Sequence, residues 1–124
     1  MKEKINLGDA ELVVMKVIWD AGKAVNTQYI SDAVAEREWR RTTISTFLTR
    51  LVQKGALSCE KVGKQYFYTA LLKESEYKKA QTKSLIKNLY GGSVKAFAVA
   101  LFEDEKLSEE DIRELGSIFD DWRK

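Results

Sequence analysis

The segment from Arg40 to Lys54, RRTTISTFLTRLVQK, combines an apolar stripe with a face that contains no carboxylate. Its apolar residues recur at helical spacing: Ile44, Phe47, Leu48, Leu51 and Val52. The opposite face carries Arg40, Arg41, Thr42, Thr43, Ser45, Thr46, Thr49 and Arg50. Hydroxyl and guanidinium groups suit phosphates and base edges, whereas an ordinary solvent-facing helix mixes Glu with Lys. The pattern favours a DNA recognition helix over a merely solvated one.

Chain length limits what can surround this helix. With 124 residues and 44% hydrophobic content, the sequence can form one ordinary core, or a small domain plus an assembly element. No apolar run approaches the ~18 residues of a membrane span, and MKEKINLGDAEL lacks the apolar core of a signal peptide. We therefore expect a cytoplasmic protein without membrane insertion. The single cysteine, Cys59, cannot form an internal disulfide.

The absence of histidine excludes several kinds of chemistry. Without His and with one Cys, the chain cannot assemble a zinc site of nitrogen and sulfur ligands, or a Ser-His or Cys-His nucleophile pair. Clustered carboxylates such as Glu109, Glu110 and Asp111 lack apolar flanks that would raise a pKa, so they indicate a solvated helix start. We expect a protein that is not an enzyme and has no cofactor or metal.

Positive charge is concentrated around the predicted recognition helix. The net charge of the chain is only +2, yet the segment 40–66 contains a single acidic residue, Glu60. Its basic residues are Arg40, Arg41, Arg50, Lys54, Lys61 and Lys64. Such a local excess is the electrostatic footprint expected where a phosphate backbone lies.

Periodicity and capping residues predict three helices followed by a hairpin. The first helix runs from about Asp9 to Ala21, and its inward stripe is expected to contain Leu12, Met15, Ile18 and Trp19. Asn26 is a suitable N-cap for a second helix through about Glu36. Gly55 ends the third helix, and strands are expected over 56–61 and 65–70. The fold class is mainly α with a small β-hairpin, a winged helix-turn-helix over residues 1–72.

Within this domain the expected DNA contacts differ by role. Thr43, Ser45 and Thr46 are predicted to face base edges, and Arg40, Arg41 and Arg50 to reach phosphates. Thr42 shares the same helix face. The start of the second helix could present Thr27 and backbone amides to a phosphate. A wing contact is expected from Lys61, Lys64 and Gln65.

Residues 73–124 are predicted to form a helical dimerisation domain. Helices are expected over 73–89 and 93–102 and after an N-cap at Ser108. Their apolar stripes contain Leu85, Ile86, Leu89, Val94, Phe97, Leu101, Ile112, Leu115, Ile118, Phe119 and Trp122. One chain is too short to bury three such stripes, so a second copy is the economical partner. Packing of these helices back onto the winged domain is the alternative.

Several motifs resemble the penicillinase and methicillin-resistance repressor family of the BlaI/MecI type. They are AELVVMKVIWDAG, TTISTFLTRLVQKG, GKQYFYTAL and NLYGGSVKAFAVALFEDEKLSEEDIREL, which together span nearly the whole chain. Copper-responsive repressors of the CopY type share the amino half. The resemblance implies a homodimeric winged-helix repressor that binds a palindromic operator in double-stranded DNA, with a possible connection to antibiotic resistance.

Three departures from the family bear on function. Penicillinase-type repressors commonly have Lys-Thr-Ile-Arg-Thr where this chain has TTIST over 42–46, so two basic contacts are missing. The copper-sensing relatives end in clustered cysteines, which are absent after Cys59. A sensor-linked protease cuts the penicillinase type at an Asn-Phe pair, and the aligned positions here are Ala100 and Leu101. Relief of repression by proteolysis is therefore an expectation from resemblance alone.

Three alternative functions remain open at the level of sequence. One is a helical adaptor that binds protein partners, and another is a copper-responsive-type repressor without its metal-binding tail. A third is a redox sensor based on Cys59, although a lone strand cysteine is usually inert packing. Steep loss of promoter affinity with rising salt would distinguish a DNA-binding repressor from an adaptor.

Overall fold

The computed structural model describes residues 5–104 and 107–122. The chain divides into an amino-terminal unit, Met1–Lys79, and a carboxy-terminal unit, Ala80–Lys124. Helix α4 (Glu74–Tyr90) runs through this division, so the boundary expected after Leu72 stays a prediction. No helix within the described ranges combines the length and apolar composition that a membrane crossing requires.

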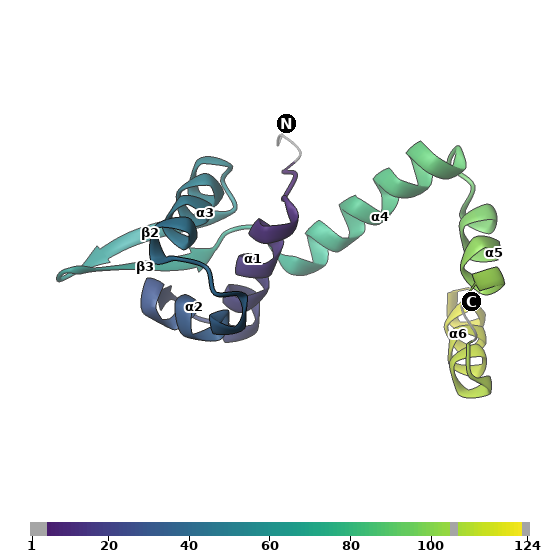
Figure 1. The fold of residues 1–124 in the computed structure, drawn as a ribbon. Coiled ribbons are helices and arrows are strands. Elements are labelled where there is room, and N and C mark those ends of the chain that lie inside the picture. Colours follow the sequence, from purple (N-terminus) through teal and green to yellow (C-terminus); the bar gives the residue numbers. More distant parts are fainter. Residues whose placement is uncertain (1–4, 105–106, 123–124) are drawn as a thin grey trace. The chain divides into compact units, whose positions relative to one another are not determined.

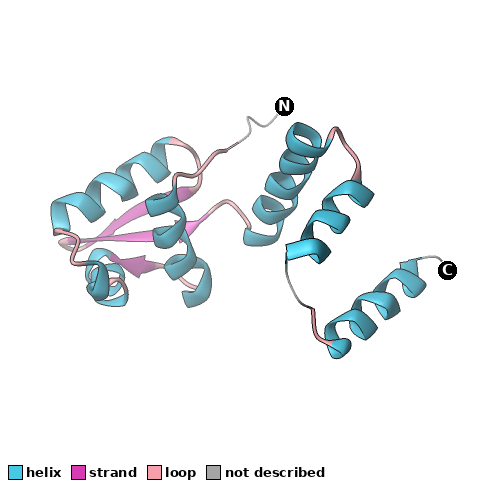
Figure 2. Cartoon of the chain, turned by 45° about the vertical axis from the view of Figure 1, so that its right-hand side comes forward, coloured by secondary structure: helices cyan, strands magenta, loops and turns pink. Residues whose placement is uncertain are grey.

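The amino-terminal unit has the element order of a winged helix-turn-helix (Figures 1 and 2). Its elements are α1 (Asp9–Ala21), β1 (Val25–Asn26), α2 (Thr27–Ala33), the 3-10 helix η1 (Ala35–Arg37), α3 (Arg41–Gln53), β2 (Leu57–Val62) and β3 (Gln65–Ala70). The bounds of α1 agree with the prediction, and Gly22 ends the helix in the left-handed conformation, with φ of 66°. The fold class, mainly helical with a small hairpin, is confirmed.

The sheet connects the hairpin to the start of α2. Strand order is β1-β3-β2, with both pairs antiparallel. In the hairpin Val62 pairs with Gln65, and Gly63 adopts φ of 65°, which a side chain would disfavour in so tight a turn. In β1, Asn26 pairs with Phe67. This third strand places the first residues of α2 beside the wing, as we call the β2–β3 hairpin.

One hydrophobic core holds the three helices and the base of the wing together. Its buried residues are Val14, Met15, Ile18, Val25, Ile30, Val34, Ile44, Leu48, Leu51, Ala56 and Leu57. Of the inward stripe expected for α1, Met15 and Ile18 are buried in this core and Trp19 packs against it. Leu12 lies outside the core at intermediate burial, whereas Val14 is fully buried. The stripe predicted for α3 packs as expected, with Phe47 and Val52 at its margins.

Helix α2 is shorter than the sequence indicated. It ends at Ala33 instead of near Glu36, because buried Val34 leaves the α-region, with φ of −110° and ψ of 22°. The chain then forms η1 and turns through Glu38, a non-glycine residue with φ of 55°. Trp39 follows and packs edge-on against Phe47, with ring centroids 5.1 Å apart. This contact carries the chain from the core to the start of α3.

The carboxy-terminal unit contains most of α4, α5 (Val94–Asp104) and α6 (Glu109–Trp122). Gly91 and Gly92 separate the first two helices, with φ of 57° and 86°. Ser108 caps α6 as predicted, and Ser93 caps α5; each side chain accepts a backbone N–H from three residues later. None of the side chains described between residues 80 and 124 is buried.

Candidate nucleic-acid interface

The outer face of α3 is exposed along its whole length. Its inner side buries Ile44, Leu48 and Leu51 in the core. The exposed residues are Arg41, Thr42, Ser45, Thr46, Thr49 and Arg50, with Arg40 at the N-cap. Thr43 is only half-exposed, because it lies at the margin of the face next to Phe47. The predicted face therefore exists, and its centre lies at Thr42, Thr46 and Thr49 more than at Thr43.

Two threonines on this face hydrogen-bond to the helix itself. The Thr46 Oγ1 hydroxyl donates to the Thr42 carbonyl at 2.9 Å, and the Thr49 Oγ1 hydroxyl donates to the Ser45 carbonyl at 2.9 Å. Each bond spans four residues, a common arrangement for threonine within a helix. Both side chains are thereby held in a defined orientation.

A polar groove of about 380 Å³ lies between α3, the start of α2 and the wing. It is lined by Asn26, Thr27, Gln28, Arg41, Lys64, Gln65 and Tyr66. Four of these residues were predicted DNA contacts: Thr27, Arg41, Lys64 and Gln65. The structure thus gathers residues from three separate sequence segments around one groove. None of its lining residues is acidic.

Asn26 links α2 to the wing. Its Oδ1 accepts the Tyr29 backbone N–H at 2.8 Å, which caps α2 as predicted, and its Nδ2 donates to Gln65 Oε1 at 2.7 Å. The cap is predictable from neighbouring residues, whereas the contact with Gln65 is not, because Asn26 and Gln65 are 39 positions apart. Gln65 is therefore held by a protein partner at the first position of β3.

The wing presents cations beside an aromatic ring. Lys61 and Tyr66 are cross-strand partners, and the Lys61 Nζ lies 5.7 Å from the centre of the Tyr66 ring. Tyr66 is 48% exposed, so its ring is accessible at the surface of the wing. Lys64 is exposed at the turn.

Tyr68 is the wing tyrosine that does pack against the core. Burial raises the pKa of its phenol, and the neighbouring Cys59 raises it further, whereas a hydrogen bond with Thr27 lowers it. The net shift is upward, so the phenol stays protonated under ordinary conditions. Thr27, which lines the groove, is thus a neighbour of Tyr68. Cys59 is a free, exposed thiol.

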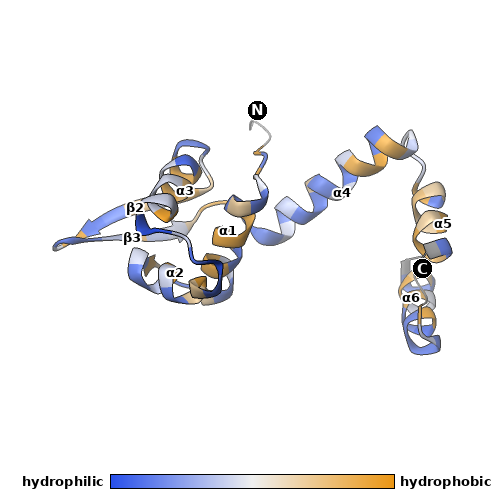
Figure 3. Cartoon of the chain, in the orientation of Figure 1, coloured by the Kyte–Doolittle hydropathy of each residue, from blue (hydrophilic) through white to orange (hydrophobic). Residues whose placement is uncertain are grey.

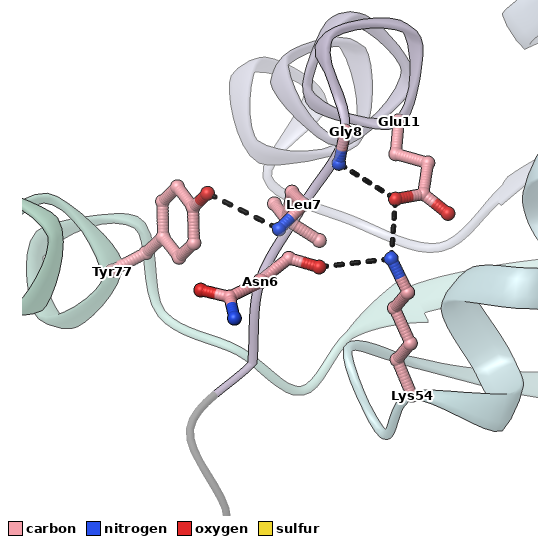
Figure 4. Close-up of polar contacts among 6 residues, drawn as sticks. All are labelled: Asn6, Leu7, Gly8, Glu11, Lys54 and Tyr77. Atoms are coloured by element: carbon pink, nitrogen blue, oxygen red, sulfur yellow. Dashed lines mark hydrogen bonds and ion pairs between the residues drawn. The ribbon is translucent and has the colours of Figure 1, made fainter.

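Lys54 belongs to a different set of contacts from the one its charge suggested. Its Nζ donates to Glu11 Oε1 at 2.5 Å and to the Asn6 carbonyl at 2.8 Å, as Figure 4 shows. Glu11 also accepts the Gly8 backbone N–H at 2.7 Å. Lys54 therefore fastens the end of α3 to the start of α1, and it is a structural cation within the basic segment 40–66.

The electrostatics of Glu11 follow from these contacts. Burial raises the pKa of its carboxyl, but the hydrogen bonds from Lys54 and Gly8, with the charges of Lys54 and Arg50, outweigh burial and lower the pKa overall. Arg50 thus lies near Glu11, and it does not line the groove that contains Arg41.

The first turn of α4 is attached to the amino-terminal unit. The Leu7 backbone N–H donates to the Tyr77 hydroxyl at 3.3 Å, next to the Asn6 carbonyl that Lys54 binds (Figure 4). The Trp19 indole donates to the Leu72 carbonyl at 2.8 Å, and its ring lies 6.2 Å from that of Tyr77. The segment that joins the wing to α4 is therefore held by Trp19 of α1 at Leu72 and by Leu7, just before α1, at Tyr77.

The carboxy-terminal unit exposes the apolar side chains predicted for an interface. The ribbons of α4, α5 and α6 contain orange segments in Figure 3, which mark hydrophobic residues. Those exposed are Leu85, Leu89, Val94, Leu101, Ile112, Leu115, Ile118 and Phe119, while Ile86 and Phe97 are half-buried. The side chain of Trp122 lies outside the described residues. Ala100 and Leu101, the predicted cleavage positions, lie within α5.

Comparison with known proteins gives concordant matches. The family model described as Penicillinase repressor matches residues 7–121. The penicillinase repressor of Bacillus licheniformis is 35% identical over 121 residues, covering 98% of this chain and 94% of that protein. The methicillin resistance regulatory protein MecI of Mammaliicoccus sciuri is 33% identical over 112 residues, covering 90% of this chain and 91% of the relative.

Two solved structures resemble the amino-terminal part of the chain. They are the solution structure of the DNA binding domain of the repressor BlaI, and that of the Bacillus licheniformis BlaI monomeric form in complex with the blaP half-operator. Both are 41% identical and cover 62% of this chain and 94% of the solved chain. The TM-scores are 0.54 and 0.52.

Proposed function

The chain belongs to the penicillinase repressor family, and from this premise we propose that it represses transcription as a homodimer bound to a palindromic operator in double-stranded DNA. It is a DNA-binding transcriptional regulator and not an enzyme. The names of its relatives connect the family with penicillinase and methicillin resistance. Its proposed place of action is the cytoplasm, where the operator lies.

The groove lined from α2, α3 and the wing is the observation that carries this proposal. Its lining combines the cations Arg41 and Lys64 with amide and hydroxyl groups and contains no carboxylate. Phosphates are bound by such cations and by groups at the start of a helix, and these contacts set the register of a protein on DNA. We assign Arg40, Arg41, Lys61 and Lys64 to phosphates, with Thr27 at the start of α2.

The exposed face of α3 is the proposed reader of base edges. Ser45, Thr46 and Thr42 have short side chains that can contact bases only if the helix lies in the major groove. We expect Thr43 to contact DNA from the margin of this face. Gln65, which is held in place by its hydrogen bond from Asn26, is expected to contact DNA from the wing. Arg50 lies near Glu11, so we expect a smaller effect from Arg50 than from Arg41 on DNA affinity.

Exposed apolar side chains support a homodimer. Eight of the predicted interface residues are exposed within the carboxy-terminal unit, including Leu89 at 72% and Phe119 at 61%. Exposure of this many large apolar side chains is typical of a protein interface. A second copy also doubles the DNA contacts, which a palindromic operator requires.

A protease partner is the proposed route of release. Cleavage between Ala100 and Leu101 would separate α6 from the rest of the chain. Both residues are helical, so a protease needs local opening of α5 to reach the peptide bond. This chain lacks the Asn-Phe pair of the penicillinase type, so the protease must accept small and aliphatic residues.

The test measures binding of the full chain to a DNA fragment that it selects from a random-sequence pool. We expect specific binding that weakens steeply between about 50 and 200 mM salt. Arg41→Ala and Lys64→Glu should lower affinity and the salt slope without changing thermal stability. Lys16→Ala, which removes an exposed cation on α1 away from the groove, should bind as the parent does. Weak binding that ignores sequence would instead support a protein adaptor.

A further inference from the structure

The threonines of α3 offer less to a base than their type suggests. A hydroxyl group has one proton to donate. In Thr46 and Thr49 that proton is directed at the carbonyls of Thr42 and Ser45, each at 2.9 Å. Both residues are nevertheless exposed at the centre of the free face. What they present outward is therefore an acceptor oxygen and a methyl group.

This pair of groups matches some bases and not others. In the major groove guanine shows only acceptors, N7 and O6, which need a donor from the protein. Adenine and cytosine show an amino donor, and thymine shows a methyl group that packs against apolar side chains such as the threonine methyl. A threonine whose proton is already used can accept from an amino group and cover a thymine methyl. It cannot serve guanine without breaking its bond to the helix.

The neighbouring outward-facing positions offer guanine only the short hydroxyl groups of Thr42 and Ser45. An Arg or Lys side chain is the usual partner of guanine. The cations nearest in sequence, Arg41 and Arg50, stand at the two ends of the face, in the groove and near Glu11 respectively. The residues between them that face outward are Thr42, Ser45, Thr46 and Thr49. Nothing in this stretch is a long cationic donor.

We propose that Thr46 and Thr49 are specificity-determining residues that read thymine methyl groups, so that each half-site has A·T pairs where the middle of α3 lies. The inference rests on the proposed function, in which α3 enters the major groove. It adds the chemical class of the base feature that is recognised. Burial of one methyl group corresponds to about a fourfold change in affinity, which is a measurable effect at a single base.

The experiment replaces thymines of the selected fragment one at a time by deoxyuridine, which lacks only the methyl group. The full-length chain should lose about fourfold in affinity at one or two thymines of each half-site. Thr46→Ser and Thr49→Ser keep the hydroxyl and remove the methyl, so each should abolish discrimination at its own position. Thr46→Val keeps a methyl and should retain that discrimination. Thr69→Ser, an exposed change on β3, is the matched control.

The possible results distinguish failure of the thymine-methyl inference from failure of the proposed DNA-binding function. Specific binding that is indifferent to every thymine methyl, or serine variants that discriminate as the parent does, would overturn the inference alone. Absence of any sequence-specific binding would overturn the proposed function, and the inference with it. Thermal melting of each variant shows that the compared proteins are equally folded.

Discussion

At the residue scale, the contrast between Lys54 and Lys64 shows that charge in the sequence does not reveal its use. Both lie in the basic segment that indicated DNA binding. Lys64 lines the groove, whereas Lys54 binds Glu11 and the Asn6 carbonyl. Glu11 is buried and Lys54 is half-exposed, so the pair is partly shielded from solvent. One lysine is available to a phosphate and the other stabilises the fold.

Lys54→Met should therefore lower stability and leave the salt dependence of DNA binding unchanged. The variant leaves the buried Glu11 carboxylate with only the Gly8 N–H, and a hydrogen bond to a charged group contributes about 1.5 to 3 kcal/mol. Urea unfolding at pH 7 measures the loss, and titration of operator binding with salt measures the slope. If Lys54→Met reduced the dependence of operator affinity on salt, Lys54 would be a DNA contact after all.

Glu11 adds a pH dependence whose sign follows from its pKa. The folded-state pKa is lowered, so the charged carboxylate stabilises the fold above its ordinary value of 4.5. This contribution is lost as the pH falls from there through the folded-state pKa. Glu11→Gln should lower stability at pH 7 and flatten its decline in acid, as urea unfolding at several pH values would measure. An acid decline as steep as the parent's would assign the effect to other carboxyl groups.

At the element scale, the helices were predictable and their long-range attachments were not. Capping residues and periodicity located the ends of α1 and α3 to within a residue, because these signals act within a few positions. The end of α2 was not predicted, because the backbone conformation of Val34 follows from its burial in the core and not from its neighbours in the sequence. The groove was only partly predicted, since Asn26 and Gln65 meet across 39 positions.

The bond between Asn26 and Gln65 should control how the wing meets DNA. Asn26→Ser keeps an oxygen that caps α2 and removes the Nδ2 donor to Gln65. We expect little change in stability. Operator affinity should fall about fivefold and depend less on salt, because the turn that contains Lys64 loses the hydrogen bond that holds Gln65 next to it. Asn26→Ala removes both contacts and should cost about 1 kcal/mol of stability as well.

A double-variant comparison distinguishes positioning from a direct DNA contact of Gln65. If the bond is what matters, Gln65→Leu alone and together with Asn26→Ser should give the same loss of operator affinity as Asn26→Ser alone. Additive losses would show that the two residues contact DNA independently.

At the scale of the whole molecule, the two units of the chain differ in how their helices bury apolar side chains. The amino-terminal unit has a filled core and a polar outer face, and Tyr77 and Trp19 attach the first turn of α4 to it. The carboxy-terminal unit buries none of its described side chains. The apolar residues that periodicity predicted are exposed within this unit. Association with a second copy, as proposed above, would remove them from water.

Dimerisation should therefore determine operator affinity. Two linked domains can occupy half-sites one helical turn apart, about 34 Å, and linkage raises affinity by about 10² to 10⁴ over a single domain. A chain that ends after Val99 lacks α6 and the end of α5. We expect it to fold its amino-terminal unit, sediment as a monomer and bind a palindromic operator weaker by that factor.

Substitution in the full-length chain separates the loss of a surface from the loss of a segment. Phe119→Asp places a charge on the exposed apolar face of α6, whereas Glu114→Ala changes an exposed polar position of the same helix. The first should reproduce the monomer and its weak binding, and the second should sediment and bind as the parent does. Operator affinity equal to that of the intact chain, measured at the same salt for the truncated protein and for Phe119→Asp, would show that a single DNA-binding unit is sufficient and that the carboxy-terminal helices serve another partner.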